Sequence, residues 1–149
     1  MACNWICSYK TDYMQTKKLP KFFIVDDDPF CRLRYNQHLI NLGFRDNVLF
    51  DNGLDCINKL NLQPDIIFLD YDMQPYNGLE MIEKINRLNP DIYLLLISGQ
   101  KDMQVAINAL KSGAFDYVIK GEHDLDKISS VLQKMFVKTK QMTRLCEVN

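Results

Sequence analysis

Residues 64–70 read Pro-Asp-Ile-Ile-Phe-Leu-Asp, a short apolar run that ends on an acid. Its β-branched and aromatic side chains favour a β-strand. Runs of this kind alternate with amphipathic segments from Lys21 onward. The five runs are Phe22–Val25, Val48–Phe50, Ile66–Leu69, Tyr93–Ile97 and Tyr117–Ile119. The alternation predicts an α/β fold, a doubly wound five-stranded parallel sheet with helices on both faces.

The segments between the runs carry the signals of helix ends. Asp28 followed by Pro29 predicts the start of a first helix, and Gly43 predicts its end. We expect the other helices over residues 53–61, 78–89 and 102–111 and from about residue 124 onward, where Asp124 is a candidate N-cap.

Length and composition exclude several classes of protein. A chain of 149 residues predicts one domain, and no apolar run approaches the roughly 18 residues of a membrane span. A net charge of −1 argues against direct nucleic acid binding. The five cysteines show no C-x-x-C spacing and indicate reduced thiols, so we expect a cytoplasmic protein.

The domain is expected over residues 20–138. Residues 1–19 contain a short apolar patch without a preceding basic region, which argues against a signal peptide and for an N-terminal extension. Residues 139–149 are expected to form a C-terminal tail.

Polar residues follow four of the five predicted strands. Asp26 and Asp27 follow the first strand, Asp70 the third, Ser98 the fourth and Lys120 the fifth. Ligands of doubly wound sheets bind at the carboxyl ends of the strands, so we expect these side chains to meet in one shallow pocket. Singly, each residue is more typical of a helix cap, a strand end or the surface, but together they indicate a functional site.

The gathered carboxylates indicate a cation. Acids from neighbouring strands repel one another unless a positive charge lies between them, and an open site of oxygen ligands suits Mg²⁺. With a metal ion and Lys120 neutralising the charge, a phosphoryl group can approach Asp70. The carboxylate of Asp70 can then attack phosphorus to form an acyl phosphate.

Residues 21–136 resemble a response regulator receiver domain of two-component signalling along their whole length. Five ordered motifs carry the resemblance. They are Ile-Val-Asp-Asp-Asp-Pro at 24–29, the opening run at 64–70, Asn-Gly-Leu-Glu at 77–80, Leu-Leu-Ile-Ser-Gly at 95–99 and Gly-Ala-Phe-Asp-Tyr-Val-Ile-Lys at 113–120. The resemblance implies a flavodoxin-like sheet of strand order 2-1-3-4-5.

The resemblance also implies roles for residues. Asp70 would be phosphorylated by a histidine kinase or a histidine phosphotransfer protein, and the phosphoryl group would be held by Lys120 and Ser98. Mg²⁺ would be bound by Asp27, Asp70 and the backbone carbonyl of Asp72, with Asp26 helping. Ser98 and Tyr117 would switch a surface that binds a downstream protein, and Asp72 and Gln100 would flank the path of an attacking water. The chain would be a phosphoacceptor switch that catalyses only its own phosphorylation and slow dephosphorylation, and no other enzyme activity is expected.

Two departures from the family pattern alter the expected geometry. Proline stands at Pro75, one position later than usual after the acceptor, with Gln74 before it. Gly121 follows Lys120 in place of the usual proline, so a cis bond there would cost several kcal/mol and we expect a trans bond or a distorted turn.

Two other functions stay open at this point. Ile67-Phe68-Leu69-Asp70-Tyr71-Asp72 also resembles the nucleophile motif of haloacid-dehalogenase-type phosphatases, although that motif normally opens the fold. The chain could also be an interaction module that has lost the phosphorylation chemistry. The presence of Asp27, Asp70, Ser98 and Lys120 argues against this second alternative.

Overall fold

The computed structural model describes residues 19–148, and for residues 140–148 the helical backbone alone. All five predicted strands are present, and all neighbours pair in parallel in the order β2-β1-β3-β4-β5, which confirms the predicted fold. The strands are β1 (Phe22–Val25), β2 (Asn47–Phe50), β3 (Ile66–Asp70), β4 (Tyr93–Ser98) and β5 (Asp116–Ile119).

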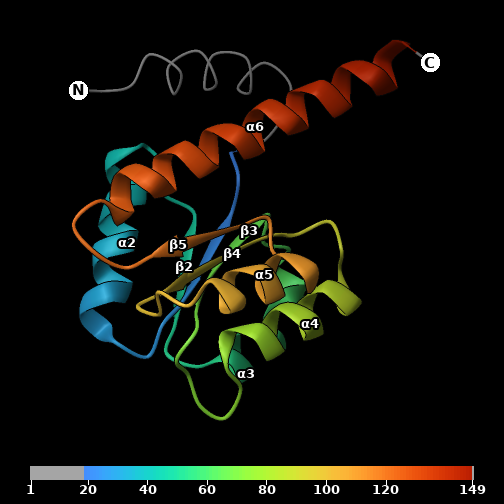
Figure 1. Ribbon diagram of the computed structural model, residues 1–149. Coiled ribbons are helices and arrows are strands. Elements are labelled where there is room, and N and C mark those ends of the chain that lie inside the picture. The colour runs from blue at the N-terminus through green and yellow to red at the C-terminus, as the bar shows by residue number, and fades with distance from the viewer. Residues whose placement is uncertain (1–18, 149) are drawn as a thin grey trace.

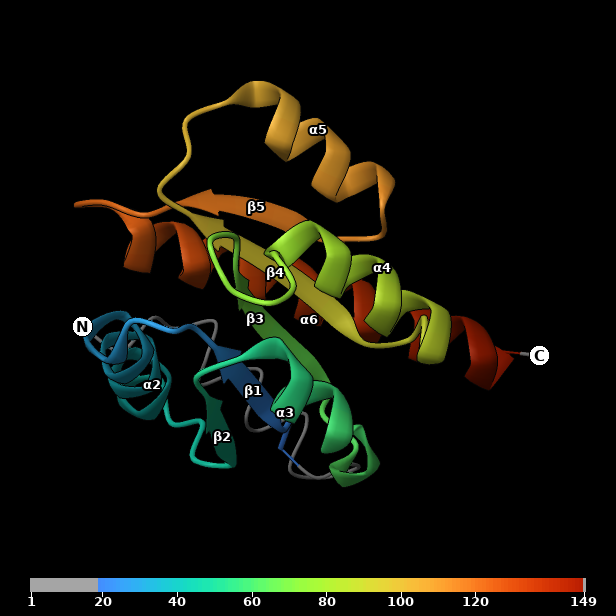
Figure 2. The same ribbon diagram turned by 90° about the horizontal axis from the view of Figure 1, so that it is seen from below.

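Helices cover both faces of the sheet (Figures 1 and 2). One face carries α2 (Pro29–Asn41) and α6 (Asp124–Val148). The other carries α3 (Gly53–Asn58), α4 (Gly78–Leu88) and α5 (Met103–Lys111), with the 3₁₀ turn η1 (Leu60–Leu62) after α3.

One helix boundary differs from the sequence prediction. The helix expected over residues 53–61 ends at Asn58, and η1 continues to Leu62, after which Gln63 takes a left-handed φ of 58°. The last helix, for which the sequence predicts a start near residue 124, runs from Asp124 to Val148 and so continues past residue 138, while the domain bounds themselves stay a prediction. Residues 1–18 of the predicted N-terminal extension lie outside the described residues.

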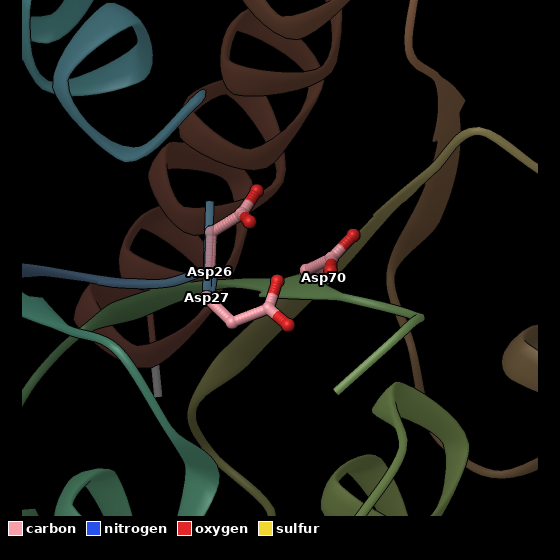
Figure 3. A group of neighbouring side chains, drawn as sticks. All are labelled: Asp26, Asp27 and Asp70. Carbon is pink, nitrogen blue, oxygen red and sulfur yellow. The ribbon is translucent and has the colours of Figure 1, made fainter. Parts of the chain in front are cut away.

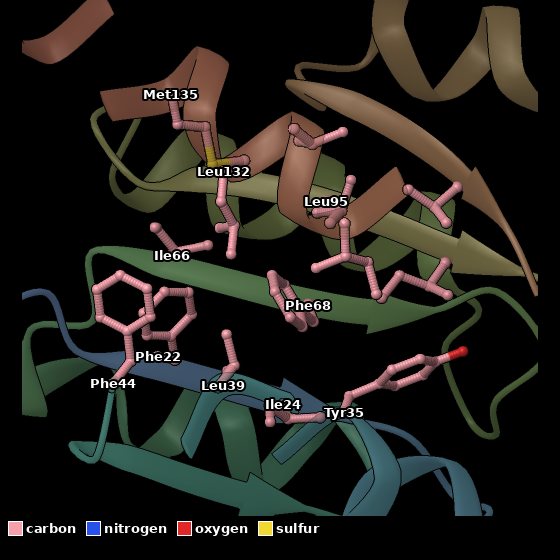
Figure 4. Packing of buried hydrophobic residues seen from close by; sticks show 14 of the residues in the cluster. Phe22, Ile24, Tyr35, Leu39, Phe44, Ile66, Phe68, Leu95, Leu132 and Met135 are labelled. Carbon is pink, nitrogen blue, oxygen red and sulfur yellow. The ribbon is translucent and has the colours of Figure 1, made fainter. Parts of the chain in front are cut away.

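Two apolar clusters fix the helices on the sheet. The central strands β1, β3 and β4 are buried along almost their whole length and alternate their side chains between the two faces. On one face, Phe22 and Phe68 pack with Leu39 of α2 and Leu132 of α6 (Figure 4). The cluster on the other face holds α3, α4 and α5 to the sheet. A rigid layered core therefore fixes where each strand ends.

The start of α4 is held close to the end of β3. Asn77 and Glu80 form a capping box, each side chain accepting from the other's backbone amide. A Cβ atom on Gly78 would lie 2.6 Å from the carbonyl oxygen of Asp70 and 2.4 Å from Leu96. Glycine is therefore required for this close approach of α4 to the predicted acceptor strand.

Within residues 19–148, none of the helices combines the length and the apolar character that crossing a bilayer would require. Cys31 and Cys56 are free thiols, as predicted.

Candidate functional site

Three carboxylates converge at the carboxyl ends of β1 and β3 (Figure 3). Asp26 and Asp27 follow β1 directly, and Asp70 is the last residue of β3. One carboxylate oxygen from each of the three lies within 4.8 Å of the others. Asp26 and Asp70 are buried, whereas Asp27 is exposed. The pocket predicted from the strand ends therefore exists, and it opens to solvent on the side of Asp27.

Lys120 supplies the positive charge of this pocket. Its Nζ atom lies 2.8 Å from Oδ1 of Asp70 and 2.9 Å from Oδ2 of Asp26. Its backbone amide donates to the carbonyl of Ser98 over 2.8 Å, which continues the pairing of β5 with β4. The sheet thus places the ammonium between two acids that come from different strands.

Burial and neighbouring charges shift the pKa of both partners. Burial raises the pKa of Asp70 to about 6, and the charges of Asp26 and Asp27 act in the same direction against the lowering effect of Lys120. Burial acts to lower the pKa of Lys120, but its hydrogen bonds with Asp70 and Asp26 together raise it above its ordinary value. Lys120 therefore stays charged at neutral pH, and Asp70 is a destabilised carboxylate.

Ser98 and Tyr117 both form hydrogen bonds with the backbone of Gln100. Ser98 is fully buried at the end of β4, and its Oγ atom accepts from the Gln100 amide over 3.0 Å. The half-buried Tyr117 on β5 donates its hydroxyl to the Gln100 carbonyl. The two predicted switch residues therefore lie on either side of one loop residue, at the edge of the acidic pocket.

A protein-family model for the response regulator receiver domain matches residues 22–133, which is most of the chain. The chain belongs to this family. The match ends within α6 and includes each strand and each residue of the pocket.

This receiver domain spans most of the length of some relatives and a smaller part of others. The chemotaxis protein CheY of Thermotoga maritima is 29% identical over 101 residues, which are 67% of this chain and 84% of that protein. The transcriptional regulatory protein ZraR of Klebsiella oxytoca is 32% identical over 118 residues, which are 78% of this chain but 26% of ZraR.

Solved structures share the fold of this receiver domain. The CheX–CheY–BeF3–Mg²⁺ complex from Borrelia burgdorferi matches with a TM-score of 0.75 and 22% identity, over 83% of this chain and 93% of that one. The receiver domain of the Francisella response regulator 1452 matches with a TM-score of 0.72 and 21% identity, over 80% of this chain and 98% of that one.

The remaining predicted site residues lie in exposed loops of the receiver domain. The side chain of Asp72 is exposed, two residues beyond Asp70, and is not one of the three converging carboxylates. Its predicted contribution to the metal site is its backbone carbonyl, which stays a prediction. Gln100 is exposed after β4. Among residues 19–148 the one cis bond joins Gln74 to Pro75, so the bond from Lys120 to Gly121 is trans, one of the two outcomes expected.

Sequence reasoning missed an ion pair that borders this site. Asp124 was expected to be an N-cap, but it is the first residue of α6 and its carboxylate points to α2. There it accepts from Arg34 over 2.6 Å and from Tyr35 over 2.9 Å. The pair joins residues 90 positions apart, so no local pattern could have signalled it.

Proposed function

We propose that this chain is a phosphoacceptor switch in which Asp70 is phosphorylated in a Mg²⁺-dependent reaction. The observation that carries the proposal is the position of Asp70, which lies at one strand end between two further acids and the ammonium of Lys120. The family of the chain supports the same function.

The donor set fits a divalent cation. Three carboxylates and one ammonium leave a net charge of −2 in a partly buried pocket, and all the side-chain donors on offer are oxygen atoms. Mg²⁺ prefers such ligands and retains waters on an open side, which exposed Asp27 provides. We assign Asp27, Asp70 and the Asp72 carbonyl as its ligands, with Asp26 in support. When bound, Mg²⁺ supplies the charge neutralisation that the incoming phosphoryl group needs.

The chemical step forms a bond between a carboxylate oxygen of Asp70 and phosphorus. The bond that breaks joins phosphorus to the imidazole nitrogen of a phosphohistidine on the donor, and the electron pair of this bond stays on the nitrogen. Lys120 is placed to donate to a phosphoryl oxygen, because it already contacts Asp70. Ser98 can offer its hydroxyl from the end of β4.

The partners are inferred from the family of the chain. Its membership of the receiver domain family implies a histidine kinase or a histidine phosphotransfer protein as the donor. The receiver of the signal is a downstream protein that distinguishes the two states of the surface beside Ser98 and Tyr117. We place this exchange in the cytoplasm, with no direct role for nucleic acid.

The test compares labelling with turnover. Purified protein is incubated with acetyl phosphate and Mg²⁺, and both bound phosphate and released inorganic phosphate are followed. We expect at most one phosphate bound per chain, loss of labelling in EDTA, and slow release. Rapid release over many cycles would instead indicate a phosphatase of the Asp-x-Asp type, and a protein that stays unlabelled would indicate an interaction module.

A further inference from the structure

The segment that joins Lys120 to α6 is short and exposed. Gly121, Glu122 and His123 are all exposed, and a Cβ atom on Gly121 would meet nothing within 4 Å. The strand pairing of the Lys120 amide with the Ser98 carbonyl ends one residue before Gly121, and glycine has the largest backbone freedom of any residue. Packing therefore does not fix the chain at Gly121, where the Lys120 side chain must be kept directed at the pocket, and hydrogen bonds to Gly121 matter for its position.

The buried carboxylate of Asp124 forms such a hydrogen bond. Its Oδ2 atom accepts from the Gly121 amide over 3.4 Å, from Arg34 over 2.6 Å and from the Tyr35 hydroxyl over 2.9 Å. Asp124 is 2% exposed. Burial acts to raise the pKa of Asp124, but the hydrogen bonds from Arg34, Tyr35 and Gly121 together lower it below its ordinary value. The carboxylate is therefore charged at neutral pH and holds donors from two parts of the chain.

Both of its side-chain donors stand on α2, which is fixed to the acidic pocket. Asp28, which caps α2, directly follows Asp26 and Asp27, and Arg32 of α2 donates to the Asp26 carbonyl over 2.7 Å. The Tyr35 ring lies in the apolar cluster, with its hydroxyl pointing out of it (Figure 4). The position of Asp124 is thus set by the same helix that follows the metal-binding acids.

We propose that Asp124, held by Arg34 and Tyr35, is a positioning residue that fixes the backbone at Gly121 and so keeps Lys120 directed at Asp70. The role of Lys120 in this inference rests on the proposed function. The hydrogen bonds of Asp124 to Gly121, Arg34 and Tyr35 are present without phosphorylation. A carboxylate that only joined α2 to α6 would need no bond to Gly121. The bond to Gly121 is what connects this ion pair to the pocket.

The test compares Asp124→Asn with Asp126→Asn, an exposed acid in the same first turn of α6. Tyr35→Phe is the second variant, because it keeps the ring in the core and removes one donor to Asp124. Urea unfolding first defines conditions under which each variant is folded. Two quantities are then measured: the NMR signals of the Gly121 amide and the Lys120 ammonium, and the rate of phosphorylation by acetyl phosphate at saturating Mg²⁺.

We expect Asp124→Asn to shift both NMR signals and to slow phosphorylation roughly tenfold, because small displacements of a catalytic group cost large factors in rate. The Mg²⁺ concentration for half-maximal rate should stay unchanged, since the acids that hold the ion are untouched. Tyr35→Phe should give smaller changes of the same kind, and Asp126→Asn none.

A folded Asp124→Asn that reacts as fast as Asp126→Asn and keeps its Lys120 signal would overturn the inference, whatever its stability. If Asp124→Asn does not fold, an unchanged rate and an unchanged Gly121 signal in Tyr35→Phe would overturn it. Wild-type protein that takes up no phosphate would contradict the proposed function instead, and the Lys120 signal would still decide whether Asp124 positions that side chain.

Discussion

The ammonium of Lys120 and the carboxylate of Asp70 are in contact at 2.8 Å, although Lys120 follows β5 at the edge of the sheet and Asp70 ends the central β3. The two strands are not neighbours, because β4 lies between them. The Lys120 side chain therefore reaches across the end of β4, past Ser98. A phosphoryl group on Asp70 would be within reach of both residues.

The raised pKa of Asp70 predicts a stability effect with a defined sign. Its carboxyl group has a pKa of about 6 in the folded protein, against an ordinary value of 3.8, so the folded state binds this proton more tightly. Stability is therefore lost as the pH rises from about 4 to about 6. In EDTA at pH 7 we expect Asp70→Asn to be more stable than wild type by roughly 1 kcal/mol, a value reduced for solvent screening.

Urea unfolding at pH 7 and at pH 4.5 checks this effect. The gain in stability of Asp70→Asn over wild type should shrink at the lower pH. Asp51 is an exposed acid after β2, and Asp51→Asn should show no such gain. A variant at position 70 that is less stable than wild type at pH 7 would show that the ion pair with Lys120 outweighs burial and repulsion.

The three converging acids predict that the protein binds a divalent cation and that this binding depends on the exposed acid, Asp27. Asp27 makes no hydrogen bond or ion pair among residues 19–148, so its carboxylate is free to bind an ion. We expect Asp27→Ala to weaken Mg²⁺ binding at least tenfold, because carboxylates are the principal ligands of this ion. Calorimetric titration measures it, with Asp51→Asn as the control. Equal affinity in Asp27→Ala and wild type would refute the metal assignment.

The shared contact with Gln100 predicts how the signal leaves the pocket. Drawing the Ser98 hydroxyl toward a phosphoryl group would release the Gln100 amide, and the Tyr117 hydroxyl holds the carbonyl of the same residue. Phosphorylation can shift the equilibrium between two conformations only if the phosphoryl group interacts better with one of them. Here it would favour the conformation in which the Ser98 hydroxyl points to it rather than to Gln100.

NMR of phosphorylated protein tests this path. In wild type we expect shifts at Tyr117 and in α5, and in Ser98→Ala these shifts should be reduced by more than half even where labelling survives. Ser130→Ala, an exposed serine on α6, should behave as wild type. Wild-type shifts confined to the pocket would contradict the path.

Asp72 and Gln100 are expected to set the lifetime of the phosphoryl group. Both are exposed beside the pocket, where Asp72 can orient a water but also adds negative charge, and Gln100 can donate and accept without charge. We expect alanine at either position to change the decay rate several-fold with little loss of stability, since exposed loop positions rarely contribute much to it. Decay after removal of the donor measures this, and rates equal to wild type in both variants would leave the two residues without a kinetic role.

Much of the fold could be predicted because periodic patterns encode it. Fully apolar runs such as Ile66–Leu69 occur where a strand is covered on both faces, and Asp28-Pro29 and Asn77-Gly78 mark helix starts by local hydrogen bonding. The residues after the strands then fall at one edge by topology alone. This is why the sequence alone predicts that Asp26, Asp27, Asp70 and Lys120 lie together.

The parts that escaped prediction depend on tertiary contacts. Residues 54–63 contain neither proline nor glycine to signal the break after Asn58, and the left-handed residue after η1 is Gln63 rather than a glycine. The carboxylate of Asp124 turns to α2 because Arg34 and Tyr35 lie there, and a helix-start motif carries no information about a partner 90 residues away. Short sequence patterns specify helices and strands. Contacts between side chains from distant parts of the chain are determined only when the protein has folded.

Chemical trapping can identify which residue carries the phosphoryl group, and thereby decide whether Asp70 is the acceptor. Protein labelled by acetyl phosphate in Mg²⁺ is reduced with borohydride, which converts a phosphorylated aspartate to homoserine, and its peptides are sequenced by mass spectrometry. We expect homoserine at position 70 alone, and none in Asp70→Asn. Homoserine at position 26 or 27 in wild type, or undiminished trapping in Asp70→Asn, would contradict it.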